Sequence, residues 1–264
     1  MPGNRFFWID AFAPEPFTGN PAVVCLLDDD VAASAMQAMA REFNVSETVF
    51  LRGADGEYDI RWFTPTRELP LVGHATLAAA HAIMTAVEPK RRSVVFNSHL
   101  SGRLPATREG DGFAITLPAD EIVPCELPIA LRDGLGTVAA ETHIGRHYVA
   151  VLRSAGEVAS VKPDFAALAT LDRPTIAITA PGEDADYVLR FFAPANGVPE
   201  DPVSGVAQCS LVPYWAKRLG RDTLHSRQLS ERRGRMTCTL QGVGVIVAGP
   251  CRTIAEGTMP AISA

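Results

Sequence analysis

The sequence predicts an α+β protein of two pseudo-symmetric halves, each a curled, mostly antiparallel sheet around a central buried helix. Three features support this fold class: a pattern of segments that occurs twice, one helix in each copy that is expected to be wholly buried, and short strand-like segments around each helix. The chain has 264 residues, of which 47% are hydrophobic and 20% charged. This length and composition suffice for two globular domains with packed cores.

The repeated pattern has an almost constant spacing. RWFTP at 61–65 is matched by RFFAP at 190–194, which lies 129 residues later, and the same spacing relates 69–70 to 198–199. After a short insertion the spacing is 132. The pairs at this second spacing are 73–75 with 205–207, 102–104 with 234–236, and 110–112 with 242–244. Two copies of this length indicate duplication of a domain of about 130 residues rather than a solenoid.

The duplication predicts where the halves begin and end. The first half is expected at 1–118 and the second at 126–264, with a return of the last strand to the first half left open. The seam near 118–128 contains prolines and a cluster of acids, as linkers do.

Each predicted element of the first half follows from its apolar pattern. An Ala- and Met-rich segment with helical spacing predicts a helix at 32–42. A second helix at 74–86 is apolar on every face, so it must be buried on every side. Pro65 lacks a sheet donor and ends the strand before it. The predicted strands are 6–12, 22–27, 48–51, 58–63, 93–97, 102–107 and 113–117.

The second half repeats this plan. A helix is predicted at 165–169, because Pro163 and Asp164 are typical of a helix start. The buried central helix is predicted at 206–218. The predicted strands are 142–152, 175–179, 187–192, 235–240 and 243–248.

Composition argues against several classes of function. The formal net charge is −6 and no basic stripe is present, so nucleic acid is not expected as a partner. No apolar run approaches the ~20 residues that span a bilayer, and the N-terminus lacks a signal-peptide pattern. We therefore expect a cytoplasmic protein with no membrane partner. Five cysteines without CxxC spacing predict reduced thiols rather than disulfides or a zinc site.

Two weaker patterns do not predict a cofactor or a metal. The segment GLGTVA at 134–139 mimics a dinucleotide-binding loop but lacks the apolar strand that should precede it. His143 and His147 are four residues apart in a strand-like stretch, where they do not share the helical geometry of a metal site. We expect no cofactor and no bound metal.

The most promising place for chemistry is a loop-to-helix junction that occurs once in each half, at Gly73 and at Gly205. Glycine lets a ligand approach the backbone closely, and the first amides of a helix have no partner within the helix. Such helix ends bind carboxylates or phosphates. Duplicated helices are expected to aim both N-termini at one cleft, which predicts a small anionic ligand.

Polar residues gather near these junctions. His74 follows the first glycine, and Asp201 and Ser204 precede the second. Glu47 stands at the entrance of an apolar strand, where desolvation raises the pKa of a carboxyl group toward a useful acid–base range. Each residue also has a purely structural explanation: a capping residue for His74 and Ser204, a helix-start acid for Asp201, and a surface glutamate for Glu47.

Several motifs resemble the signature of one protein family, and they follow the family order over nearly the whole chain. They are DAF at 10–12, PFTGNPAVV at 16–24, SET at 46–48, RWFTP at 61–65, GHATLA at 73–78, EDPVSG at 200–205, and QLS at 228–230 leading into Arg233-Gly234. The chain thus resembles the PhzF-like, or phenazine biosynthesis-like, family.

The resemblance implies the fold of diaminopimelate epimerase, homodimers, and cofactor-independent isomerisation of dihydro-hydroxyanthranilate, a small cyclic amino acid. It implies that Glu47 moves the proton, while His74 and Asp201 line the pocket and help to place or relay protons. The substrate-binding residues that it implies are Asn20, Gly73, Ala75, Gly205, Val206 and Gly234.

Three departures from the family pattern affect the expected chemistry. Val72 stands where the family often has Cys, and Cys209 has no counterpart in the first half, so racemisation by two facing thiols is not expected. Val206 stands where a serine is usual, and the missing hydroxyl puts the substrate in doubt. Gln208 stands where His is frequent.

Three functions remain open. The favoured one is a cofactor-independent isomerase that uses general acid/base proton transfer on a small carboxylate-bearing metabolite. The alternatives are an amino or hydroxy acid epimerase, and a non-catalytic protein of this fold that binds a ligand or partner. The intact set of Glu47, His74 and Asp201 favours an enzyme.

Overall fold

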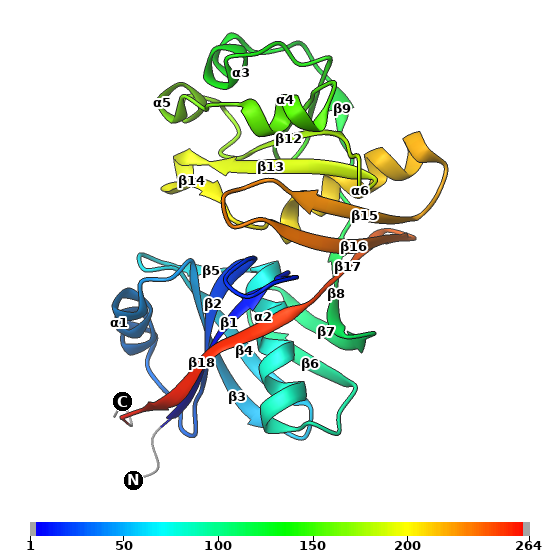
Figure 1. Cartoon of the computed structure of the whole chain (residues 1–264). Coiled ribbons are helices and arrows are strands. Elements are labelled where there is room, and N and C mark those ends of the chain that lie inside the picture. The colour runs from blue at the N-terminus through cyan, green and yellow to red at the C-terminus, as the bar shows by residue number, and fades with distance from the viewer. Residues whose placement is uncertain (1–3, 261–264) are drawn as a thin grey trace. The chain divides into compact units, whose positions relative to one another are not determined.

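The computed structural model describes residues 4–260, which fold as two compact units. Unit 1 contains the chain up to Thr116 together with the chain from Ala248 onward, and unit 2 is Leu117–Val247. In each unit, strands lie around one central helix, α2 (Gly73–Ala82) in unit 1 and α6 (Gly205–Leu219) in unit 2 (Figure 1).

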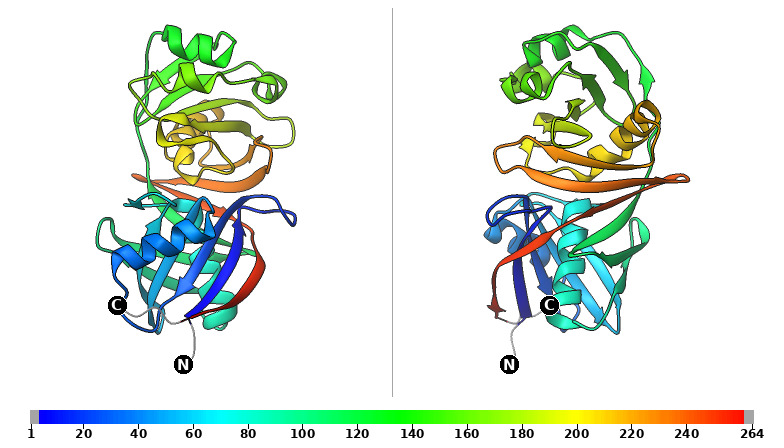
Figure 2. Two further views of the ribbon diagram at one scale, coloured as in Figure 1. Left: turned by 90° about the vertical axis from the view of Figure 1, so that its left-hand side faces the viewer. Right: turned by 45° about the vertical axis from the view of Figure 1, so that its right-hand side comes forward.

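The strands of unit 1 surround helix α2 (Gly73–Ala82), as two further views make clear (Figure 2). Most pairings are antiparallel, whereas β2–β3 and β4–β6 are parallel. The last strand, β18, pairs with β1, and Asn4 lies opposite Met259. The strands and the remaining helices are β1 (Asn4–Ala11), β2 (Asn20–Leu26), α1 (Ala33–Phe43), β3 (Glu47–Ala54), β4 (Glu57–Phe63), β5 (Glu68–Leu69), the π-helical turn η1 (Ile83–Val87), β6 (Ser93–Ser98), β7 (Gly102–Glu109), β8 (Gly112–Pro118) and β18 (Cys251–Met259).

Unit 2 repeats the plan around helix α6 (Gly205–Leu219). The parallel pairs are here β11–β12 and β13–β15, at the positions of β2–β3 and β4–β6. Its other elements are β9 (Val123–Pro124), α3 (Ile129–Leu135), β10 (Glu141–Ile144), β11 (Tyr148–Val151), α4 (Ala155–Ser160), α5 (Phe165–Leu168), β12 (Ile176–Pro181), β13 (Tyr187–Ala193), the 3-10 turn η2 (Pro194–Asn196), β14 (Val198–Asp201), β15 (Thr223–Gln228), β16 (Gly234–Gln241) and β17 (Gly244–Gly249).

An arginine–glutamate pair that occurs once in each unit marks the duplication in three dimensions. Arg61 of β4 binds Glu68 of β5 through two hydrogen bonds of 2.8 and 2.7 Å, and Arg190 of β13 binds Glu200 of β14 through two of 2.8 Å. Glu68 and Glu200 are 132 residues apart, so the predicted match of 69–70 with 198–199 is wrong by three residues. The insertion lies before β14, where η2 lengthens the loop.

The two central helices confirm the prediction from their apolar sequences. Eight of the ten residues of α2 are buried, which explains why it has no polar face. The helix predicted at 74–86 ends as an α-helix at Ala82 and continues as the turn η1. None of the described helices is both long enough and apolar enough to cross a membrane.

The strand predicted at 142–152 is instead the hairpin β10–β11. Gly145 lies in its turn, where an added Cβ would come within 2.8 Å of the carbonyl oxygen of Glu121. The strand β18 was not predicted, because most of its side chains are exposed and it therefore lacks an apolar alternation. Backbone pairing with β1, rather than burial, positions it.

His147, the residue that precedes β11, is expected to make the fold less stable in acid. Its ring is fully buried beside Phe191, and burial lowers its pKa from 6.5 to about 4. The unfolded chain therefore binds a proton between these values that the folded chain excludes. The contribution of the neutral ring to the free energy of unfolding is fully present above pH 6.5 and is lost as the pH falls toward 4. Between pH 7.5 and 5 the free energy of unfolding decreases by about 2 kcal/mol.

Replacing this ring by an uncharged one should remove that loss. We expect His147→Phe to flatten the dependence of the unfolding free energy on pH in urea titrations at pH 7.5 and 5. The control is His225→Phe, because His225 is exposed in β15. An equal loss of stability in the His147→Phe protein and the natural chain would contradict the assignment.

Candidate active site

Three polar side chains meet at one end of unit 1. Asn20 is the first residue of β2, Glu47 is the first residue of β3, and His74 is the second residue of α2. Because β2 and β3 are parallel, with Ala22 beside Glu47, both strands begin at the same edge of the sheet. Residues that are 54 positions apart in sequence are thereby brought into contact.

The three side chains lie close together and are almost fully buried. His74 Nε2 lies 3.0 Å from Glu47 Oε2, and Asn20 Nδ2 lies 3.2 Å from His74 Nδ1. The first contact is a close approach whose angle falls short of an aligned hydrogen bond. The side chains of His74 and Glu47 are 6% and 14% exposed, and Asn20 is fully buried. Electrostatic interactions in such a place are stronger than in water.

The Asn20 amide determines which nitrogen of His74 carries the proton. An amide nitrogen can only donate, so Nδ1 of His74 must be the acceptor. In the neutral ring the proton is then on Nε2, the nitrogen that faces Glu47. The arrangement pairs a ring N–H donor with a carboxylate acceptor, and both can take part in proton transfer.

The N-terminus of α2 adjoins this group. Val72 precedes the helix and no side chain caps it. Thr76 returns its N–H and its hydroxyl to the Val72 carbonyl, at 3.0 and 2.7 Å. Gly73 and Ala75 are the first and third residues of the helix, so their amides belong to the turn that has no intrahelical acceptors.

The matching junction of unit 2 is built differently. The Ser204 side chain accepts a hydrogen bond of 3.2 Å from the Ala207 N–H, which confirms Ser204 as the N-cap of α6. Asp201 ends β14, and its carbonyl accepts a 2.6 Å hydrogen bond from Gln228 Nε2. The other amide atom of Gln228 accepts from the Ser204 N–H at 2.8 Å. One buried glutamine therefore holds both ends of the segment that carries Asp201.

The role of Gln228 was not predicted from sequence, although its motif was noted. Gln208, one of the departures from the family pattern, has a structural role: it accepts from the Tyr187 hydroxyl and donates to the Ser204 carbonyl. Gly234 begins β16 opposite Gln228. Val206 follows Gly205 as His74 follows Gly73, so unit 2 has an apolar residue at the position of the histidine.

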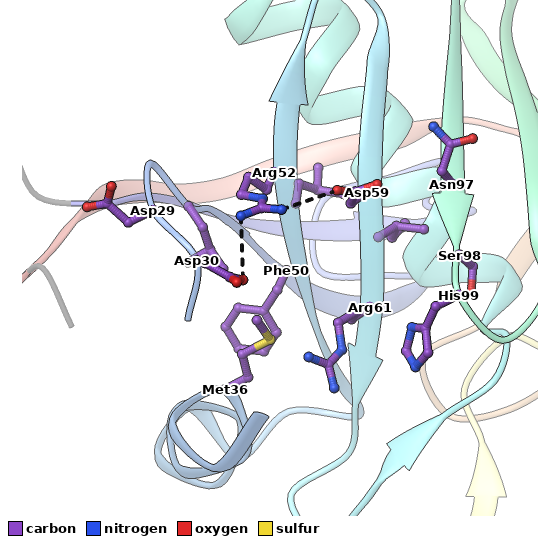
Figure 3. A pocket seen from close by; sticks show the side chains of 13 residues that line it. Asp29, Asp30, Met36, Phe50, Arg52, Asp59, Arg61, Asn97, Ser98 and His99 are labelled. Carbon is purple, nitrogen blue, oxygen red and sulfur yellow. Dashed lines mark ion pairs between the residues drawn. The ribbon is translucent and has the colours of Figure 1, made fainter. Parts of the chain in front are cut away.

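A separate cavity of about 400 Å³ lies on the other face of β3 and β4 (Figure 3). Phe50 and Arg52 line it and alternate along β3 with Glu47 and the buried Val49, so they point away from α2. Arg52 forms ion pairs with Asp30 and Asp59 at 3.5 and 3.7 Å (Figure 3). These charges are largely exposed and compensate one another, so neither Arg52 nor its two carboxylate partners is poised for chemistry.

The cysteines are poorly suited to proton transfer. Cys209 is 1% exposed, and burial raises the pKa of its thiol to about 12. Burial likewise raises the pKa of Cys238 and of Cys251 to about 12. A thiol becomes a base only as the thiolate, so these residues are inert near neutral pH.

Several known proteins are similar to this chain in sequence and in fold. An uncharacterized isomerase of Pseudomonas aeruginosa is 42% identical over 253 residues, which cover 96% of this chain and 97% of that protein. A crystal structure of a PhzF-family phenazine biosynthesis protein from Enterococcus faecalis has a TM-score of 0.94 and 37% identity, and the match covers 97% and 99% of the two chains. A hydroxyproline epimerase from Agrobacterium vitis shares only the fold, with a TM-score of 0.59, 12% identity, and coverage of 98% and 91%.

These likenesses define the protein as an isomerase with the diaminopimelate epimerase-like fold, which confirms the fold class predicted from sequence. The family model described as phenazine biosynthesis-like protein matches residues 9–257. The chain belongs to this family.

Proposed function

We propose that this isomerase moves a proton on a small carboxylate-bearing metabolite without a cofactor, and that Glu47 is the proton-transfer group. The observation that carries the proposal is the 3.0 Å approach of Glu47 to a histidine whose tautomer is set by Asn20. A carboxylate and a ring N–H side by side supply one base and one acid.

The proposed reaction is a balanced proton shift. Glu47 takes a proton from an acidic C–H of the substrate, and the electron pair of that bond moves into the adjacent unsaturated or carboxyl-bearing system. The Nε2–H of His74 stabilises the charge that develops, and Glu47 returns the proton at another carbon. No electrons enter or leave the substrate overall, so the reaction needs no redox partner.

The substrate carboxylate is proposed to lie at the N-terminus of α2. The helix has no side-chain cap, and a carboxylate bound to the first amides, those of Gly73 and Ala75 among them, gains from the positive end of the helix dipole. Gly205 and Gly234 are proposed as further backbone contacts, and Asp201 as a second acid–base group. Val206 favours a substrate other than dihydro-hydroxyanthranilate, because it cannot form the hydrogen bond of the usual serine.

A substrate screen tests the proposal. The protein is incubated in D₂O with dihydro-hydroxyanthranilate, trans-4-hydroxy-L-proline, proline and a set of small unsaturated carboxylic acids, and NMR follows isomerisation and C–H exchange. We expect turnover of at least one small carboxylate, and weak or no turnover of dihydro-hydroxyanthranilate. Tight binding of such acids without any exchange would favour the non-catalytic alternative. Inactivation by a thiol reagent would favour an epimerase that uses cysteine.

Asn20 is proposed to position His74 through the tautomer. Asn20→Asp has nearly the same shape, but its carboxylate accepts from Nδ1–H and so moves the ring proton away from Glu47. We expect kcat to fall about 10²-fold, the order that one misplaced acid–base partner costs. The ¹⁵N shifts of His74 should report the change of tautomer. Asn97→Asp on β6 is the control, and an unchanged tautomer in Asn20→Asp would refute this role.

We further propose a homodimer, as the family resemblance implies. Light scattering after size-exclusion chromatography at micromolar concentration should give twice the 28.3 kDa mass of the chain. A mass equal to one chain would contradict this.

A further inference from the structure

Unit 2 contains a cavity of about 550 Å³ that the proposed chemistry does not use. A segment at 120–124, the strand β10, and the later turns of α6 form its walls. Its volume lies in the range of small-molecule sites. Its lining residues are Asp120, Glu121, Ile122, Pro124, His143, Pro213, Tyr214, Lys217 and Arg218.

A proline inside α6 explains how this cavity is built. Pro213 has no N–H, so the carbonyl of Cys209 lacks its helical donor. The Asp120 N–H donates to that carbonyl at 2.8 Å, and Pro124 of β9 lies opposite His143 in β10. The 120–124 segment is thus attached to α6 at one end and to β10 at the other, and the cavity lies beside it.

His143 is the feature that indicates a ligand. It is 9% exposed, lines the cavity, and packs edge-on against Tyr214 with ring centroids 5.2 Å apart. Its Nδ1 is buried and has no hydrogen-bond partner within residues 4–260. A buried polar atom without a partner is unfavourable by about 1–3 kcal/mol, so the ring favours a ligand to which its Nδ1–H can donate, directly or through a water.

The charges around the cavity indicate which ligand fits. Arg218 is already paired, because it donates to Glu141 at 2.7 Å and to the Tyr214 hydroxyl at 2.8 Å. Asp120 is paired with Arg146 at 2.9 Å. Lys217 and Glu121 line the same cavity, and neither forms an ion pair with any described residue. Both side chains are exposed at the rim, so one cation and one anion are available to a ligand beside Ile122, Pro124 and Pro213.

We infer that this cavity is a second binding site, for a zwitterionic α-amino acid with an apolar ring. Lys217 and His143 bind its carboxylate, Glu121 binds its ammonium group, and the ring lies on Ile122, Pro124 and Pro213. The lining part of α6 begins eight residues after Gly205, about 12 Å along the helix at 1.5 Å per residue, so this site is separate from the Gly205 junction.

Calorimetric titration with three probes tests the assignment. L-Phenylalanine carries both charges, 3-phenylpropionate lacks the ammonium group, and phenethylamine lacks the carboxylate. We expect L-phenylalanine to bind more tightly than either. Lys217→Gln, Glu121→Gln and His143→Phe should each weaken it about tenfold, the low end of what a hydrogen bond to a charged group supplies at an exposed rim.

Matched variants locate the binding. Lys162→Gln removes an exposed lysine elsewhere in unit 2 and should leave the affinity unchanged. Glu47→Gln should also leave it unchanged, whereas Lys217→Gln should keep isomerase turnover. Three results would each overturn the inference: no binding of L-phenylalanine, equal binding of 3-phenylpropionate, or full affinity in the Lys217→Gln and His143→Phe proteins.

Discussion

Glu47→Gln should lower turnover by roughly 10²–10⁴-fold, the contribution of a positioned general acid–base group. The substitution keeps the size of the side chain and removes the basic carboxylate that faces His74 at 3.0 Å. Folding should be little affected, because the amide has nearly the same shape as the carboxylate and can lie beside the ring in the same way. The rate is measured by NMR with the carboxylate that the natural chain turns over fastest.

Glu57→Gln is the matched control for this experiment. Glu57 is an exposed residue of β4 whose ion pair with Arg103 spans 3.3 Å at the surface. It should show the turnover of the natural chain. If Glu47→Gln also kept that turnover while remaining folded, another group would have to move the proton.

The second large effect is expected at Gln228. Gln228→Leu leaves the Ser204 N–H and the Asp201 carbonyl without the amide that now binds both. Each unpaired buried backbone group costs about 1–3 kcal/mol, so we expect the two to lower the free energy of unfolding of unit 2 by about 2–6 kcal/mol. Urea unfolding followed by tryptophan fluorescence measures it, since Trp215 lies in α6 of the same unit.

Gln241→Leu is the control, because it replaces glutamine by leucine at a position where the amide is exposed. Gln241 is exposed at the end of β16, so its replacement should change stability by less than about 0.5 kcal/mol. Equal stability of the two variants would show that water, rather than Gln228, satisfies the Asp201–Ser204 segment.

Residue patterns predicted most of the elements whose buried residues are apolar, but they missed β15, where two of the three buried residues, Ser226 and Gln228, are polar. Helices α2 and α6 are buried on most sides, and the spacing of matched motifs indicated the duplication that the ion pairs of Arg61 and Arg190 display. The apolar pattern did not predict elements whose structure depends on backbone pairing or on a turn. Strand β18 is mainly exposed, and the β10–β11 hairpin turns at Gly145 within a stretch that was predicted as one strand.

The candidate site was predictable in its residues but not in its geometry. Glu47 and His74 were named from sequence, yet only parallel pairing of β2 with β3 brings Asn20 to the ring of His74. That Asn20 binds substrate stays a prediction, and its contact with Nδ1 of His74 adds a proposed positioning role. The Gln228 bridge depends on contacts across 24 and 27 residues, for which local spacing offers no signal.

The most direct test of the central claim is the deuterium content of the substrate carbon after incubation in D₂O. Mass spectrometry of the recovered substrate and product gives the rate at which solvent deuterium enters. If Glu47 carries the proton, the natural chain introduces deuterium and Glu47→Gln does so roughly 10²–10⁴-fold more slowly. Equal rates of deuterium entry with the two proteins would contradict it.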